Sequence, residues 1–84
     1  MQTDLLVIPG IGIKIRQDLI KIGYPTVESL KDRNPEFLYE KLCVMQGHRI
    51  DRCVLYVLRC AVYFASTQIK DPDKLKWYKW KDRR

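Results

Sequence analysis

The sequence has no long hydrophobic run and few cysteines, and each shortage excludes a class of protein. No uninterrupted apolar stretch approaches the ~20 residues that a membrane-spanning helix needs, so we expect no membrane insertion. The chain begins without a basic segment, and the apolar run at residues 5–8 is too short for a secretory signal peptide. These absences predict a cytoplasmic protein.

The three cysteines argue against a disulfide framework because their number is odd. Cys53 and Cys60 lie in one helical segment, ~10 Å apart along its axis, which is too far for a disulfide or a shared zinc ion. Cys43 and the single histidine, His48, supply only two metal ligands. We therefore expect all three cysteines to be small buried apolar groups, and we expect no metal site and no cofactor.

What is present is a short, basic and moderately hydrophobic chain. Its 84 residues, 46% of them hydrophobic, suit one domain, residues 1–84, that buries roughly 60–65% of its unfolded surface. The formal net charge is +6, and residues 70–84 carry seven basic and three acidic side chains. Most of the excess charge therefore lies in a C-terminal tail. It suits nucleic acid without proving it, because many soluble domains are mildly basic.

Hydrophobic spacing and capping signals predict five helical segments and no strand. They cover about residues 3–7, capped by Thr3 or Gln2, and then 13–22, 27–31, 35–46 and 48–66. Asn34 is the expected N-cap of the fourth segment, with Pro35 behind it, and Gly47 ends that segment. In the two long segments the side chains expected to face inward are Phe37, Leu38, Leu42, Met45, Ile50, Cys53, Val54, Val57, Leu58, Ala61, Phe64 and Ala65.

The most informative stretch is the turn Ile-Pro-Gly-Ile-Gly at residues 8–12, which precedes a helix-period segment. Two glycines leave the amides of the turn uncovered, at a helix N-terminus that carries partial positive charge. Such a turn can hold a phosphate, although a plain glycine-rich turn without a ligand is the alternative. The expected phosphate contacts are Gly10, Ile11, Gly12, Lys14 and Arg16.

This turn resembles the helix-hairpin-helix motif of DNA-binding proteins, whose apolar-Pro-Gly-apolar-Gly hairpin it matches at residues 8–12. The resemblance implies that hairpin amides hold a backbone phosphate, usually from the minor-groove side, without reading bases. Arg16 stands where that family usually has a small residue. Either the two helices lie slightly further apart, or the arginine stem packs while its head reaches solvent or phosphate.

An offset of 37 residues relates this hairpin to a second, weaker turn, with Gly10 matching Gly47 and Arg16 matching Cys53. The second copy lacks the proline and the second glycine. We therefore expect an all-α, SAM-domain-like domain of five helices, built from two stacked helix-hairpin-helix-like units with the second hairpin degenerate. Chance similarity between two helix–turn–helix segments is the alternative.

The last long segment carries a basic and aromatic stripe opposite its apolar face, made of Arg52, Tyr56, Arg59 and Tyr63. These side chains can contact phosphates and sugars, or they can be covered by the protein itself. The tail at residues 70–84 interleaves basic and aromatic side chains, Lys76, Trp77, Lys79 and Trp80, in a pattern that suits single-stranded nucleic acid. Because exposed tryptophans are unfavourable, we favour a tail that docks on the domain, over this stripe.

Nearly the whole chain resembles the bacterial pathogenicity-locus helix-hairpin-helix proteins, which are related in name to mitomycin-resistance proteins. The matching blocks are residues 8–12, 32–39, 51–56, 59–63 and 75–81. The resemblance implies the fold and a presumed DNA-binding role, with no established activity. Ile13 and Arg16 depart from the proline and alanine expected after the hairpin, which affects the helix spacing rather than the fold.

These features favour a non-catalytic, sequence-independent DNA-binding module, weak alone because one hairpin makes few phosphate contacts. The alternative is a protein–protein adaptor that uses the Tyr/Arg stripe or the Trp-rich tail, with a protein partner or a homodimer. An enzyme is disfavoured. His48 and Asp51 lie near the second turn, but no nucleophile or metal set accompanies them, and His48 is better explained as a helix-start residue.

Overall fold

Of the 84 residues, the computed structural model describes 4–68 and 70–80. Within these residues the chain is all-helical and has no strand. Its four α-helices and three short 3₁₀ helices are η1 (Leu5–Val7), α1 (Ile13–Lys21), α2 (Val27–Leu30), α3 (Pro35–Gln46), α4 (Arg52–Ser66), η2 (Pro72–Leu75) and η3 (Trp77–Trp80). The all-α class is confirmed, whereas the described part has four α-helices in place of the five expected.

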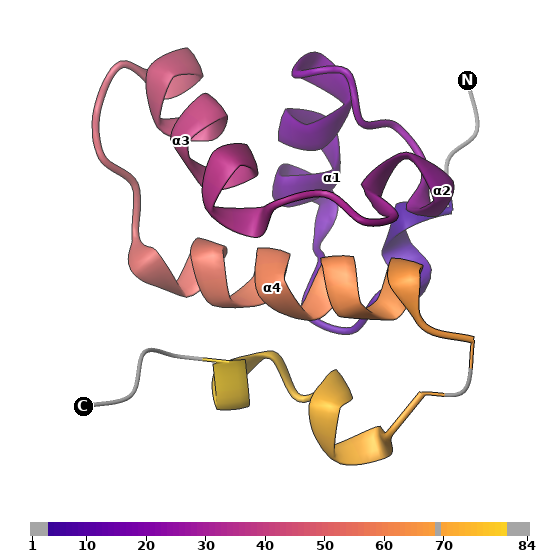
Figure 1. Ribbon diagram of the computed structural model, residues 1–84. Helices are drawn as coiled ribbons and strands as arrows, with labels where there is room; N and C mark the ends of the chain where they lie inside the picture. The colour runs from indigo at the N-terminus through magenta and orange to yellow at the C-terminus, as the bar shows by residue number, and fades with distance from the viewer. Residues whose placement is uncertain (1–3, 69, 81–84) are drawn as a thin grey trace.

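Helix α4 forms the middle of the fold. Helices α2 and α3 pack on one side of it, and η2 and η3 pack on the other (Figure 1). Because both sides are covered, Leu55 and Cys60 are buried although they lie outside the apolar face that the sequence predicts. The fully buried side chains come from η1, the turn after it and the four α-helices, and η2 and η3 contribute none; they include Leu5, Ile8, Leu19, Leu30, Leu38, Leu42, Leu55 and Leu58.

Helix α3 begins and ends where the sequence predicts. The Asn34 side chain accepts from the amides of Glu36 and Phe37 at 2.8 and 3.3 Å, and Pro35 occupies the first helical position. Gly47 closes the helix in a left-handed conformation. The expectation that Phe37 and Met45 face inward is wrong, because both are exposed. Helix α3 is apolar on two faces, and the described chain covers only one of them.

The first predicted helix is corrected by the structure. The expected α-helix over residues 3–7 is only the 3₁₀ turn η1, while Thr3 and Gln2, its expected caps, lie outside the described residues. Pro9 explains the early end, because a residue before proline is driven to an extended backbone and Ile8 has a ψ of 124°. Too few residues remain for a stable α-helical nucleus.

Helix α4 begins at Arg52, later than the predicted 48. The Asp51 side chain caps it by accepting from the Cys53 amide at 2.8 Å, which lowers the pKa of the Asp51 carboxyl. The Tyr39 hydroxyl donates to the Ile50 carbonyl and ties the preceding residues to α3. The expectation that His48 starts the helix is therefore wrong, because His48 lies in the exposed loop between the two helices.

Two cysteines behave as predicted and one does not. Cys43 and Cys60 are buried, and burial raises the pKa of the Cys60 thiol. Cys53 is exposed, because the first turn of α4 extends past the covered part of that helix. No group of three or more His, Cys, Asp or Glu side chains that could hold a metal lies within residues 4–68 and 70–80. None of the described helices combines the length and apolar character needed to cross a membrane.

Candidate nucleic-acid interface

The hairpin is a tight turn that connects η1 to α1. Ile8 and Ile11 are buried and anchor the turn to the core. Gly10 has a φ of +92°, a left-handed conformation that residues with side chains rarely adopt. The Ile11 amide donates to the Ile8 carbonyl at 3.2 Å. Of the three hairpin amides predicted to contact phosphate, the Ile11 amide is therefore engaged within the turn.

The other two hairpin amides have no acceptor among residues 4–68 and 70–80. Gly10 and Gly12 are exposed, and neither backbone N–H donates a hydrogen bond within the described part of the chain. Gly12 is the N-cap of α1, and no side chain of the described residues caps this end of the helix. First-turn amides have no partner inside their own helix, so an uncapped end holds further free donors. The hairpin and the start of α1 together form a cluster of donors that suits an anion.

Lys14 lies on the first turn of α1, where it is exposed but already paired. Its Nζ is 2.9 Å from the Asp18 Oδ1, one turn further along the helix. Asp18 is buried and also accepts from the Gln46 side-chain nitrogen at 3.4 Å. Because Asp18 is buried, loss of Lys14 would leave its carboxylate with only the longer hydrogen bond from Gln46. Lys14 can therefore contribute its charge to an incoming anion only at the cost of this pair.

Arg16 is half-buried, and its Nε is buried without a hydrogen-bond partner in the described part of the chain. The burial of this atom places the alkyl stem inside the protein, as in the second of the two arrangements expected for an arginine at this position. A buried unpaired N–H is unfavourable, so the site would gain from an acceptor close to the guanidinium.

The ring of Trp77, in η3, packs against the α-carbon of Gly10, which remains exposed on its other side. A Cβ built on Gly10 would lie 2.7 Å from Trp77 Cδ1, closer than real Cβ atoms approach, and 3.1 Å from Cγ, which is tighter than most Cβ contacts. The indole is half-buried and packs against the core. The glycine thus serves two needs, since it adopts a positive φ and leaves space for the ring. No sequence motif links residues so far apart, and sequence reasoning did not predict this contact.

The described part of the tail, residues 70–80 and called the C-terminal segment below, also packs on the basic and aromatic stripe of α4. The Arg59 Nη1 donates to the Trp80 carbonyl at 2.6 Å, and the Tyr63 and Trp80 ring centroids are 5.6 Å apart. The Tyr63 hydroxyl accepts from the Asp71 amide at 2.8 Å. The Arg59 guanidinium also lies 5.7 Å from the centre of the Tyr56 ring. Arg52, the fourth member of the stripe, is exposed at the other end of α4.

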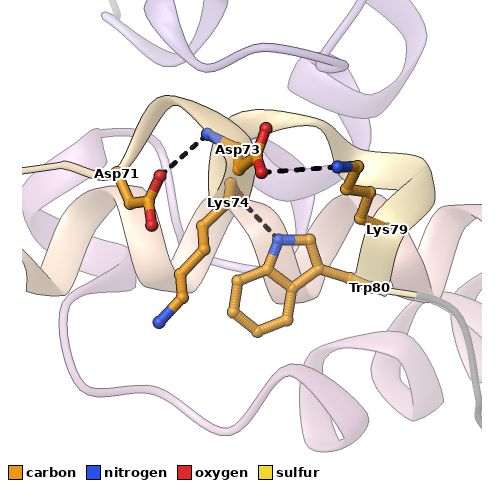
Figure 2. A pocket seen from close by; sticks show the side chains of 5 residues that line it. All are labelled: Asp71, Asp73, Lys74, Lys79 and Trp80. Carbon is orange, nitrogen blue, oxygen red and sulfur yellow. Dashed lines mark hydrogen bonds and ion pairs between the residues drawn. The ribbon is translucent and has the colours of Figure 1, made fainter.

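Around Trp80 the C-terminal segment folds on itself and forms an open pocket of about 390 Å³ (Figure 2). Asp71 caps η2 by accepting from the Asp73 amide at 3.0 Å. The Trp80 indole N–H donates to the Lys74 carbonyl at 2.7 Å. The indole N–H of this tryptophan is therefore already hydrogen-bonded within the C-terminal segment.

Two of the predicted tail lysines converge on one carboxylate. Lys79 Nζ is 3.5 Å and Lys76 Nζ is 3.7 Å from oxygens of Asp73. Asp73 is a partner that the sequence does not predict for these lysines. It reduces the charge that these lysines offer to a nucleic acid strand. The hairpin, in contrast, has donors that nothing in the described chain uses.

The chain is similar in sequence to a known protein family and to a curated protein. The family model described as "Pathogenicity locus" matches residues 1–84. A protein named mitomycin resistance protein McrB, from Streptomyces lavendulae, is 32% identical over 60 residues, which cover 71% of this chain and 57% of that protein. The chain thus matches little more than half the length of this curated relative. No solved structure matches the chain.

Proposed function

We propose that this chain, which belongs to the Pathogenicity locus family, is a non-catalytic DNA-binding module that holds backbone phosphate at its hairpin. Contacts made through backbone amides carry no base information, so binding would be independent of sequence. We also propose the finer arrangement of two stacked helix-hairpin-helix-like units. The support for it is that Gly10 and Gly47, related by the 37-residue offset, both have left-handed backbones, with φ of +92° and +79°.

One observation carries the proposal for DNA. The exposed amides of Gly10 and Gly12 have no acceptor among the described residues, and they directly precede a helix that no side chain caps. Proteins usually satisfy such donors with a cap, with water or with a ligand. A phosphate oxygen can replace the water and also gains from the positive end of the helix dipole.

The same geometry limits the affinity. The hairpin supplies few phosphate contacts, and Lys14 must loosen its pair with Asp18 to contribute its charge. We therefore expect a dissociation constant in the micromolar range or above it, and this constant should rise with salt concentration. A shallow dependence on salt, with a slope that corresponds to about two or three phosphates, is the expected signature.

In the sequence, His48 and Asp51 come closest to a catalytic pair, but the fold gives each of them a different environment. The Asp51 carboxylate caps α4, and His48 is exposed in a loop, with a ring nitrogen 3.2 Å from the Arg49 carbonyl oxygen. A general acid or base needs a partner positioned to orient it beside a substrate. This arrangement supports the proposal that the module binds without catalysis.

Gly12→Asp tests the proposal by filling the donor cluster. Aspartate is a favoured N-cap, and a Cβ at Gly12 meets nothing within 4 Å, so the variant should fold. Its carboxylate would accept from the free amides and repel phosphate. Fluorescence anisotropy with a labelled duplex at about 20–50 mM salt should show at least about tenfold weaker binding than for the unmodified chain.

The matched control is Gln68→Glu, which changes the net charge equally at an exposed position beyond the end of α4. We expect its affinity to stay within about twofold of the unmodified chain. Two results would contradict the proposal: no binding of duplex by the unmodified chain at low salt, or an equal loss in Gly12→Asp and Gln68→Glu.

The adaptor hypothesis named a surface that the chain itself occupies. Arg59 and Tyr63 of α4 hydrogen-bond to the C-terminal segment, and Trp77 lies against Gly10. A protein partner would have to displace these contacts to use the Tyr/Arg stripe. The stripe would therefore be open to a partner only after release of these contacts, whereas Tyr78 in the Trp-rich tail is exposed as it stands.

A further inference from the structure

Helix α3 exposes a large apolar surface on the side away from α4. Val44 is 80% exposed, Phe37 is 52% exposed and Met45 is 36% exposed. These side chains share one face of α3, and with Ile22 at the end of α1 they line an open groove of about 530 Å³. The fold does not need this face, because the core of α3 is formed by Leu38, Tyr39, Leu42 and Cys43 on its other side.

The charged side chains around this groove have a positive excess. Lys21 and Lys41 line it together with Glu40. The Glu40 carboxylate is neutralised by Arg49, whose Nη1 lies 3.2 Å from it. Neither Lys21 nor Lys41 forms an ion pair in the described part of the chain, and the Lys41 Nζ lies 5.4 Å from the centre of the Phe37 ring. The groove therefore presents an apolar floor with two uncompensated positive charges at its rim.

We propose that this groove binds an amphipathic helix of a partner protein that carries acidic side chains beside its apolar stripe. Apolar anchors one turn apart would contact Phe37, Val44 and Met45. Carboxylates beside them would pair with Lys21 and Lys41. Helix α3 has 12 residues and is about 18 Å long, so it can accept about three turns of a helix laid along it.

A second copy of the chain fits the groove poorly. A symmetric contact would bring Lys21 and Lys41 towards the same two lysines, while Glu40 is already bound to Arg49. The whole chain also carries a net charge of +6, so two copies repel at low salt. The partner is therefore expected to be acidic. The proposal does not depend on the hairpin and can fail or succeed without it.

Two synthetic helical peptides test this directly with the full chain. Both carry leucines at helical spacing on one face, and the flanking positions are glutamate in one peptide and lysine in the other. Titration followed by NMR should show binding of the glutamate peptide, with shifts along α3 and at the end of α1. We expect the lysine peptide to bind at least about tenfold more weakly.

Val44→Asp is the informative variant, and Val7→Asp is its control because Val7 is also exposed, at 61%, but lies in η1. We expect Val44→Asp to weaken binding of the glutamate peptide at least about tenfold, because an apolar contact is lost and the new carboxylate repels the glutamates. Val7→Asp should leave this affinity unchanged. Absence of glutamate-peptide binding, equal binding of both peptides, or equal loss in both variants would overturn the proposal. Two further results would also overturn the proposal: a dimer in sedimentation experiments, or binding to anionic vesicles, if Val44→Asp abolishes it and Val7→Asp does not.

Discussion

The indole of Trp77 lies against the α-carbon of Gly10, and a Cβ on that glycine would be 2.7 Å from the ring. This contact joins the hairpin to the C-terminal segment across almost the whole length of the chain. It also separates the two hairpin glycines in function. Gly10 supports packing and a left-handed backbone, whereas Gly12 has open space around it and begins α1.

Gly10→Ala should destabilise the fold, and Gly12→Ala should not. At Gly10 the methyl group meets both a positive φ and the Trp77 ring, for which we expect a loss of about 1–3 kcal/mol. At Gly12 the methyl group meets nothing within 4 Å, so the change should be within about 0.5 kcal/mol. Urea unfolding followed by circular dichroism measures both. Equal midpoints for the two variants would contradict this assignment.

Trp77→Ala should lower the unfolding free energy by about 2 kcal/mol, because it removes a half-buried ring that packs on the core. Tyr78→Ala, at an exposed neighbouring position, should cost clearly less. Combining Trp77→Ala with Gly10→Ala tests the contact itself. The glycine substitution should cost at least about 0.5 kcal/mol less once the ring is gone, and strict additivity would show that the two residues do not interact.

Asn34→Ala should cost about 1 kcal/mol, because two amides at the start of α3 lose their acceptor. Asn34→Asp should recover most of this loss, since aspartate accepts from the same amides and favours a helix N-terminus. Thermal unfolding of the unmodified chain, Asn34→Ala and Asn34→Asp measures both the loss and its recovery. If Asn34→Asp unfolds as early as Asn34→Ala, capping is not what Asn34 contributes.

Only one of the three thiols should react with an aromatic disulfide reagent in the folded protein. Cys53 is exposed, while Cys43 and Cys60 are buried. The hydrogen bond with Asp51 raises the pKa of the Cys53 thiol, so its reaction near pH 8 should be slower than that of a free cysteine and should accelerate as the pH rises. Cys53→Ser should remove the reaction in native buffer, and urea should release two thiols in that variant.

Local signals predicted the elements well, and long-range contacts explain where they failed. Asn34, Pro35 and Gly47 define α3 because caps act on the nearest amides and need no tertiary context. The same helix shows the limit, since its periodicity cannot decide which of two apolar faces is buried. The periodicity predicts that Phe37 and Met45 face inward, and both are exposed.

The candidate site shows the same division. The hairpin could be predicted from residues 8–12 alone, because two glycines and a proline define its backbone locally. Neither the contact between Trp77 and Gly10 nor the shared role of Asp73 beside Lys76 and Lys79 follows from spacing. Both depend on how the C-terminal segment folds back over α4.

An NMR titration of the uniformly ¹⁵N-labelled chain with a short DNA duplex tests the central claim most directly. The chain has four glycines and two tryptophans, so their amide and indole signals can be followed individually. If the hairpin holds phosphate, the amides of Gly10, Gly12 and the first turn of α1 should shift most, saturate together and return as salt is added. Shifts confined to the tryptophan indoles and tail lysines, with the Gly10 and Gly12 amides unmoved, would contradict the account.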